Sequence, residues 1–218
     1  MDVAGIITAL RFQKRDRDRV NVYLDGQFAF ALPALVAARL HPGQALDEAE
    51  IAALQAIEAE TSAYDRAVRF LGYRPRSIAE VRQYLLEHAV PASVAETVIQ
   101  RLQQAGYLDD EGFARFWVDN RQQFRPRGER ALRHELRRKG VDDAIIDAAI
   151  ARVGGDEEEA AYALARGRCQ RWRDLERRAF WQKGAAFLAR RGYAYEVIET
   201  VLRRLWQELQ EGTDTEGE

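Results

Sequence analysis

Basic side chains are concentrated between residues 121 and 139 of this 218-residue chain. Only Glu129 and Glu135 oppose them there, although the chain as a whole carries a formal net charge of -2 at pH 7. Guanidinium groups bind phosphates or carboxylates in a bidentate geometry, and they stack on bases and aromatic rings. This stretch is therefore the first candidate for a binding surface. Its cations are Arg121, Arg125, Arg127, Arg130, Arg133, Arg137, Arg138 and Lys139.

Helical geometry would arrange part of this stretch as an ordered row. In a helix that begins near residue 128, Arg130, Arg133 and Arg137 fall within one narrow sector. Leu132 and Leu136 lie on a different face, which we expect to turn toward the core. One face would then anchor the helix, while the other would offer guanidinium groups to a partner.

A second set of arginines lies on a later predicted helix and the turn after it: Arg166, Arg177, Arg178 and the central three, Arg168, Arg171 and Arg173. Trp172 and Trp181 are close to them in the sequence. Arginines mixed with aromatic rings are typical of single-stranded nucleic-acid sites and of interface hot spots. We therefore add the central three arginines to the candidate partner-binding residues.

Patterns that would support catalysis or metal binding are missing from the sequence. The three histidines are scattered and have no ligand spacing around them, and neither a glycine-rich phosphate loop nor a nucleophile elbow occurs. Cys169 is the only cysteine, which excludes an intrachain disulfide. Arg168 and Arg171 could lower its pKa, but an incidental helical cysteine is the favoured interpretation. We expect no enzyme, no metal and no cofactor.

Composition also bounds where the chain works. Its 33 basic and 35 acidic residues almost balance, and acidic segments alternate with basic ones. The first residues lack the pattern of a signal peptide, and the longest apolar run, residues 28–38, is too short to span a membrane. We therefore expect a cytoplasmic protein.

The elements that would position these residues begin with a small β module. Residues 20–24 and 27–32 flank Asp25-Gly26, and an Asp-Gly pair between alternating apolar residues predicts a two-residue hairpin turn. Residues 6–12 could supply a third strand. A long helix over residues 47–70 follows, and everything after it reads as helical.

Helix ends are unusually well marked. Asp47, Ser77 and Ser93 each stand three positions before a glutamate, which is the pattern of a capping box. Asp109 and Asp110 stand at another helix start, where acidic residues complement the helix dipole. Glycines fall where helices should end, at Gly106, Gly140, Gly154, Gly155 and Gly192.

The helical part of the chain repeats itself. Residues 74–102 align with residues 125–153 at an offset of 51, and a further shift of 52 brings a third segment into the same pattern. Leu85, Leu136 and Leu188 coincide, and the apolar positions that follow them have the spacing of one helical face. With one helix before each pair, this predicts three three-helix repeats. The predicted domains are a β-hairpin module (1–45), a linking helix (46–62), three repeats (63–108, 109–155 and 156–210) and a disordered acidic tail (211–218).

One stretch is specific enough to identify a family: GYLDDEGFARFWVDNRQQFRPRGERALRHELRRKGV, from Gly106 to Val141. It resembles the RecX regulatory proteins of bacteria, which modulate the RecA recombinase. The similarity extends from VNVYLDGQFAF to FLARRGYAYEVIETVL. It implies a mainly α fold, with three tandem three-helix repeats forming an elongated curved array after the β-hairpin module. Packing and helix initiation are the roles of the repeat motif, which comprises Tyr107, Leu108, Asp109, Phe113, Leu132, Leu136, Gly140 and Val141.

The same resemblance implies the partner. It would be RecA, as a monomer and as a filament on DNA, and the effect would be suppression of its recombinase, ATPase and co-protease activities. The cations of residues 121–139 would be the second repeat's contact surface, although the choice of individual residues rests on helical geometry. We expect a monomer. The alternative is a DNA-binding protein that competes for single strands, which the basic patches favour and the near-neutral net charge disfavours.

Overall fold

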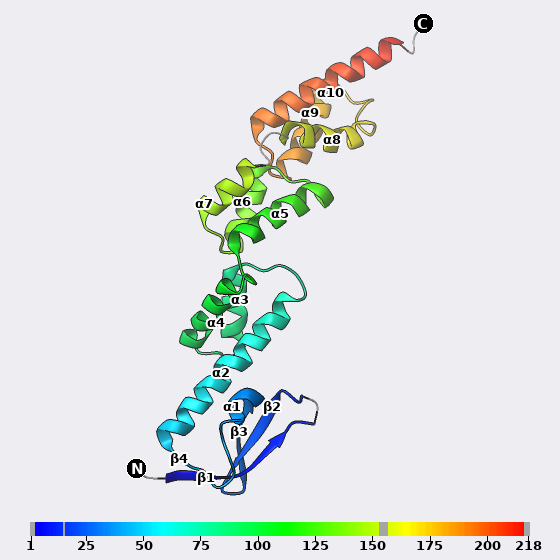
Figure 1. Cartoon of the computed structure of the whole chain (residues 1–218). Coiled ribbons are helices and arrows are strands. Elements are labelled where there is room, and N and C mark those ends of the chain that lie inside the picture. Colours follow the sequence, from blue (N-terminus) through cyan, green and yellow to red (C-terminus); the bar gives the residue numbers. More distant parts are fainter. Residues whose placement is uncertain (1–2, 15, 153–156, 216–218) are drawn as a thin grey trace. The chain divides into compact units, whose positions relative to one another are not determined.

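The computed structural model describes residues 3–14, 16–152 and 157–215 (Figure 1). The chain divides into two compact units. The first comprises Met1–Arg74 and Val81–Leu108, and the second comprises Pro75–Glu80 and Asp109–Glu218. The loop residues 75–77 and the first residues of the helix that begins at Ile78 thus belong with the second unit.

The first unit begins with a four-stranded antiparallel sheet in the order β3-β2-β1-β4. Asp25 and Gly26 form the predicted hairpin turn with φ of 48° and 84°, the left-handed conformation that such a turn requires. Ile7, Val22 and Leu32 are fully buried beneath it. The third strand is confirmed, whereas β4 was not predicted because three residues are too few to show alternation. The elements are β1 (Val3–Phe12), β2 (Arg19–Leu24), β3 (Gln27–Pro33), α1 (Ala34–Ala37) and β4 (Ala45–Asp47).

The long helix α2 (Glu48–Leu71) begins with the predicted capping box. The Glu50 backbone N–H donates to Asp47 Oδ1 at 2.8 Å, and the Asp47 N–H donates to Glu50 Oε2 at 2.9 Å. The C-terminal part of α2 contributes buried Ala63 and Ala67 and serves as the first helix of the first repeat. The other two helices of that repeat are α3 (Ile78–Glu87) and α4 (Ala92–Gln104).

The two remaining predicted capping boxes have different outcomes. The box at Ser77 is confirmed, with the Glu80 N–H donating to Ser77 Oγ at 3.1 Å. The box at Ser93 is wrong, because α4 starts two residues earlier than such a box requires, at Ala92 with Pro91 as its N-cap. Ser93 therefore lies inside the first turn, and Glu96 accepts hydrogen bonds from the Arg82 guanidinium instead.

The second unit holds the second and third repeats, each built from three helices (Figure 1). Leu136 and Leu188 are fully buried in them, as the equivalent Leu85 is in the first repeat, which confirms the predicted alignment. The last aligned apolar position of the second repeat is Val153, which lies outside the described residues, as do Gly154 and Gly155. The helices are α5 (Asp110–Phe124), α6 (Glu129–Arg138), α7 (Asp143–Ala151), α8 (Glu157–Cys169), α9 (Arg177–Ala189) and α10 (Tyr195–Thr215).

The last helix extends further than predicted. α10 continues to Thr215, five residues into the segment 211–218 for which the sequence predicts a disordered acidic tail. Extending a formed helix costs little because each added residue gains a backbone hydrogen bond without a new nucleation step. Residues 216–218 lie outside the described part of the chain.

The second helix of every repeat ends in a left-handed residue, namely Ala89, Gly140 and Gly192, with φ of 59°, 72° and 85°. Glycine is required at the last two positions by close contact as well as by φ. A Cβ on Gly140 would lie less than 3.0 Å from the methyl group of Ala79, and one on Gly192 would lie 2.5 Å from the backbone nitrogen of Ala131. Each glycine thus packs on the first turn of the preceding repeat's second helix.

Hydrogen bonds complete this joint, which occurs twice within the second unit. Asp110, the first residue of α5, accepts a hydrogen bond of 2.9 Å from the Ile78 N–H at the start of α3. Glu157, the first residue of α8, likewise accepts one of 2.8 Å from the Glu129 N–H at the start of α6. In both joints a carboxylate of one repeat satisfies an otherwise unpaired N–H at the helix start of the repeat before it.

Candidate functional site

Several cations between residues 121 and 139 are held by partners within the second unit. The Arg121 Nε donates to Glu135 Oε2 at 2.6 Å, and the Trp117 indole N–H donates to the same oxygen at 2.9 Å. The Arg121 guanidinium also lies over the Trp117 ring, 4.4 Å from its centre. Arg121 and Glu135 are each 24% exposed. This cluster joins α5 to α6 and leaves Arg121 little freedom to bind another molecule.

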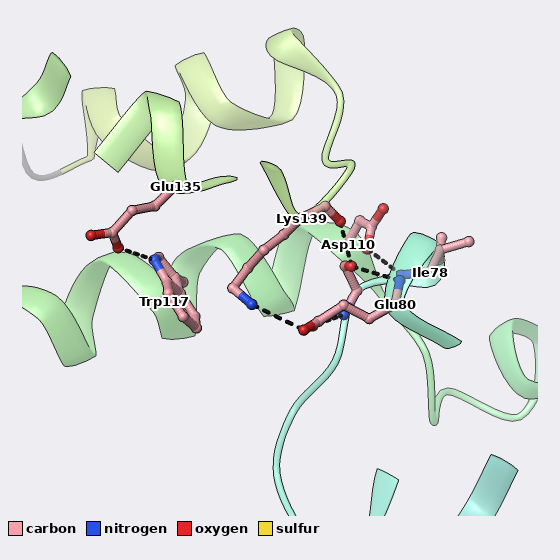
Figure 2. A network of polar contacts seen from close by, with 7 residues as sticks. Ile78, Glu80, Asp110, Trp117, Glu135 and Lys139 are labelled. Atoms are coloured by element: carbon pink, nitrogen blue, oxygen red, sulfur yellow. Dashed lines mark hydrogen bonds and ion pairs between the residues drawn. The ribbon is translucent and has the colours of Figure 1, made fainter. Parts of the chain in front are cut away.

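Lys139 belongs to the joint at the start of α3. Its Nζ lies 3.0 Å from Glu80 Oε1 and 4.3 Å from the centre of the Trp117 ring. Figure 2 shows its side chain extended between Trp117 and Glu80, while its backbone carbonyl accepts a hydrogen bond of 2.5 Å from Ser77 Oγ. With 17% of the side chain exposed, Lys139 stabilises this joint and is not part of an open cationic surface.

The predicted arginine row on α6 is covered in part by α7. Arg133 forms an ion pair with Asp147, and the Arg137 Nε lies 2.7 Å from Asp143 Oδ1. Only Arg130 of the three residues in that sector extends into solvent without an ion pair among the described residues. The predicted row of three free guanidinium groups is therefore reduced to one.

Besides Arg137, which is paired with Asp143, three cations of this stretch are exposed to solvent: Arg125, Arg130 and Arg138. None of these three has an ion pair with a carboxylate in the part of the chain that the structure describes. Arg127 is intermediate, because its Nε lies 3.9 Å from Glu135 and its Nη1 donates to the Arg190 carbonyl at 3.4 Å. The available surface of the second repeat thus centres on these three arginines.

The second predicted group is exposed, but its tryptophan is not. Arg168, Arg171 and Arg173 all reach solvent. Trp172 is only 8% exposed, and its ring packs edge-on against Phe180 and Phe187 in the core of the third repeat. The suggestion that Trp172 contacts nucleic acid is therefore wrong, because the turn after α8 directs this ring inward.

Trp181 and Cys169 also pack in or against the core of the third repeat. Trp181 is partly buried and packs against the same core. Cys169 is 6% exposed, and burial raises the pKa of its thiol, so the flanking arginines do not produce a reactive thiolate. Among the described residues, no group of histidine, cysteine and carboxylate side chains could hold a metal ion.

The repeat motif is structural with one exception. Asp109 caps α5 by accepting hydrogen bonds from the N–H groups of Glu111 and Gly112 at 3.0 and 2.8 Å. Tyr107 is 62% exposed, and its backbone N–H donates to the Leu102 carbonyl at 2.9 Å in the turn that ends α4. The buried motif residues are Leu108, Phe113, Leu132, Leu136 and Val141.

A further cationic site was missed by sequence reasoning. Arg125 and Arg127 line a hollow of about 450 Å³ together with Arg190 and Arg191, which lie more than sixty residues later in the chain. Exposed Phe124 lines the same hollow. The available signal was the adjacent pair Arg190-Arg191 directly before Gly192, which ends the second helix of its repeat; Arg191 is at the position equivalent to Lys139.

Comparison with known proteins assigns the chain to a family. Four RecX domain models match it in order: the N-terminal domain at residues 5–47, and the first, second and third three-helix domains at residues 63–102, 109–150 and 156–202. The chain belongs to the RecX family. This confirms the predicted resemblance, and it confirms a mainly helical fold with three three-helix domains after a small sheet.

Relatives named regulatory protein RecX match most of the chain. The RecX protein of Bacillus pumilus is 31% identical over 97% of this chain and 80% of its own length. That of Bacillus subtilis is 30% identical over 97% of this chain and 81% of its own length. A RecX protein of Lactobacillus delbrueckii is 40% identical over 70% of this chain, and the match spans only 57% of that relative.

Solved structures agree with the family assignment. A crystal structure of a regulatory protein RecX matches with a TM-score of 0.74 and 30% identity, over 90% of this chain and 98% of that one. RecX from Lactobacillus salivarius, with a TM-score of 0.64 and 22% identity over 68% of this chain and 97% of that one, shares the fold. Within the described residues of this chain, every helix is too short or too polar to cross a membrane.

Proposed function

We propose that this chain is a regulator that binds the RecA recombinase, alone and as a filament on DNA, and lowers its recombinase, ATPase and co-protease activities. The observation that carries the proposal is the ordered match to all four RecX domains, together with relatives named regulatory protein RecX. Binding alone suffices for such regulation, because an occupied filament surface raises the free energy of adding or retaining a subunit. We further propose that the chain acts as a monomer in the cytoplasm.

The exposed arginines of the second repeat are the proposed contact. Arg125, Arg130 and Arg138 present guanidinium groups to solvent without carboxylate partners among the described residues. Such groups can fork onto carboxylates of a protein or onto phosphates of DNA. Charge complementarity of this kind increases the association rate and fixes the register of a complex. Arg168, Arg171 and Arg173 extend the proposed surface onto the third repeat.

The ion pairs of α6 decide which arginines can be reversed to test the proposed contact without disturbing the fold. Reversing Arg133 or Arg137 would place a glutamate beside Asp147 or Asp143 and would weaken the contact between α6 and α7. Reversing Arg125, Arg130 and Arg138 removes no described ion pair, so the fold should be retained. The triple variant Arg125→Glu/Arg130→Glu/Arg138→Glu is therefore the informative one.

Binding to RecA filaments assembled on an immobilised single strand gives the measurement. The triple variant should bind at least about tenfold more weakly, because three contacts of about 0.5 kcal/mol or more are lost or reversed. A control with the same change in net charge is Arg17→Glu/Arg39→Glu/Arg69→Glu, all three exposed in the first unit. Equal weakening by both triple variants would reduce the effect to net charge, and unchanged binding of the first would exclude this surface.

Competition for single-stranded DNA remains a separate candidate. Of the features that favoured it, Trp172 is now placed in the core, whereas the arginine-lined hollow beside Phe124 is new. The same binding measurement on the bare strand separates the two functions. A regulator of the filament should bind the RecA-coated strand more tightly than the bare one, and a competitor should show the reverse.

A further inference from the structure

The hollow beside Phe124 is built mainly by two segments of the second unit that lie far apart in the sequence, with Leu164 of α8 as a further lining residue. One segment, residues 124–127, connects α5 to α6, and the other, Arg190-Arg191, ends α9. Hydrogen bonds to the two backbone carbonyls of the second segment fix them to each other. The Gly128 N–H donates to the Arg191 carbonyl at 3.0 Å, and Arg127 Nη1 donates to the Arg190 carbonyl at 3.4 Å. The joint between the second and third repeats therefore holds the hollow in shape.

Positive charge in this hollow lacks nearby compensation. Four arginines line it: Arg125, Arg127, Arg190 and Arg191. Among the described residues, Arg127 alone of these four has an ion pair with a carboxylate, and its Nε lies 3.9 Å from Glu135. Elsewhere in this unit, arginines such as Arg121, Arg133 and Arg137 have close carboxylate partners. The hollow therefore gathers four arginines with one distant carboxylate partner among the described residues.

The charged form of Arg191 is disfavoured by its surroundings in the hollow. Its pKa is lowered first by burial and then by repulsion from Arg127, Arg168 and Arg190. Its guanidinium stacks on the Phe187 ring, 3.8 Å from the ring centre, and donates to the Phe187 carbonyl at 3.0 Å. The side chain is thus anchored by contacts that leave its charge uncompensated. A bound anion would remove the repulsion, because opposite charge favours the charged form of each arginine.

The walls of the hollow indicate which anion fits. Phe124 is 67% exposed and offers an aromatic face beside the guanidinium groups, while Pro126 and Leu164 add apolar surface. A volume of about 450 Å³ lies within the usual range for small-molecule sites and exceeds what an inorganic phosphate fills. Arginine forks match phosphate oxygens, and aromatic faces stack on bases. An acidic peptide would use the arginines but would have no need for the ring.

We propose that this hollow binds a nucleoside phosphate, with the phosphate among Arg125, Arg127, Arg190 and Arg191 and the base against Phe124. The nucleoside phosphate could be part of a single-stranded nucleic acid or a free nucleotide. The site is independent of the recombinase contact proposed above, except that Arg125 belongs to both. Its test therefore uses Arg190 and Phe124 and contains no recombinase.

The experiment measures binding of the full chain to a short fluorescent oligo(dT), to dTMP, to inorganic phosphate and to a short oligoglutamate. Arg190→Glu should weaken oligo(dT) binding by about tenfold and reduce the salt dependence by roughly one phosphate contact. Phe124→Ala should weaken binding of oligo(dT) and dTMP by about fivefold or more and leave phosphate binding unchanged. Both residues are exposed, so both variants should fold. Matched controls are Arg178→Glu and Tyr195→Ala, which change exposed residues of the third repeat away from the hollow.

Each outcome decides something. Oligo(dT) binding much tighter than dTMP binding would identify a strand as the ligand, and equal affinities would identify a free nucleotide. Variants of Arg190 and Phe124 that behave like their controls would overturn the proposal. Oligoglutamate binding that exceeds oligo(dT) binding and ignores Phe124 would replace it with an acidic-peptide site. Because recombinase is absent, none of these results bears on whether the chain regulates RecA.

Discussion

Gly140→Ala should destabilise the second unit for two separable reasons. The residue has a φ of 72°, a conformation that costs an alanine about 1–2 kcal/mol. The new methyl group would also lie less than 3.0 Å from the methyl group of Ala79, on the first turn of α3. Overpacking of this kind costs about 1–3 kcal/mol. The two contributions together predict a loss of about 2–5 kcal/mol in the free energy of unfolding.

A second substitution isolates the steric part. The Ala79 Cα would lie 3.9 Å from the new Cβ, which is ordinary van der Waals contact. Ala79→Gly therefore removes the overlap and leaves the backbone strain unchanged. On its own it should cost about 0.5–1 kcal/mol, as glycine does within a helix. In the double variant, the two changes should couple favourably by about 1–3 kcal/mol, the size of the overlap that is relieved.

Urea unfolding followed by tryptophan fluorescence is the appropriate assay. All four tryptophans lie at or beyond residue 117, so their emission reports the second unit alone. Gly106→Ala supplies the backbone term, because Gly106 has a φ of 73° and no atom within 4 Å of an added Cβ. Since Gly106 lies in the first unit, circular dichroism follows that variant. Coupling of less than about 0.5 kcal/mol between positions 79 and 140 would refute the close contact that builds the joint.

Two other predictions concern partly buried carboxylates of the second unit. Burial raises the pKa of the Glu157 carboxyl. The folded state therefore keeps this proton to a higher pH than the unfolded chain does. The stability that the protonated carboxyl contributes is fully present below pH 4.5 and is lost as the pH rises through the folded pKa. Glu157→Gln keeps an acceptor for the N–H at the start of α6 and should stabilise the unit at pH 7. In urea titrations below pH 4.5 this gain in stability should disappear. A gain that persists in acid would contradict the raised pKa of Glu157. Glu135→Ala should cost about 1–2 kcal/mol in the same titrations, because it strands the Trp117 and Arg121 donors. Glu111→Ala removes only an exposed ion pair and should cost less than about 0.5 kcal/mol, and equal losses in the two variants would refute a special role for Glu135.

Local signals in the sequence were sufficient for much of the fold. The Asp25-Gly26 turn and the box at Asp47 depend on neighbouring residues, and those residues determine the backbone there. The alignment of Leu136 with Leu188 was readable because a repeat imposes one burial pattern on each copy. Ser93 misled because a helix can begin before a good capping residue when proline precedes it.

The site was harder to predict because it depends on which helix covers which face. Helical spacing placed Arg133 and Arg137 on one sector, but it could not show that Asp147 and Asp143 of α7 would face them. Partner residues on a neighbouring helix are set by tertiary packing rather than by the period of one helix. The hollow that joins Arg125 to Arg190 has the same origin, because only the joint between repeats brings those segments together.

The central claim is that this chain regulates RecA by acting on its filament. The most direct test titrates the chain into the single-strand-dependent ATPase of the cognate RecA. The account predicts that the ATPase rate falls at well below one chain per recombinase, at concentrations where the chain alone leaves the strand unbound. An unchanged rate at a molar excess of the chain would contradict the claim. Inhibition only at amounts that coat the DNA would contradict it as well, and would identify a competitor for the strand.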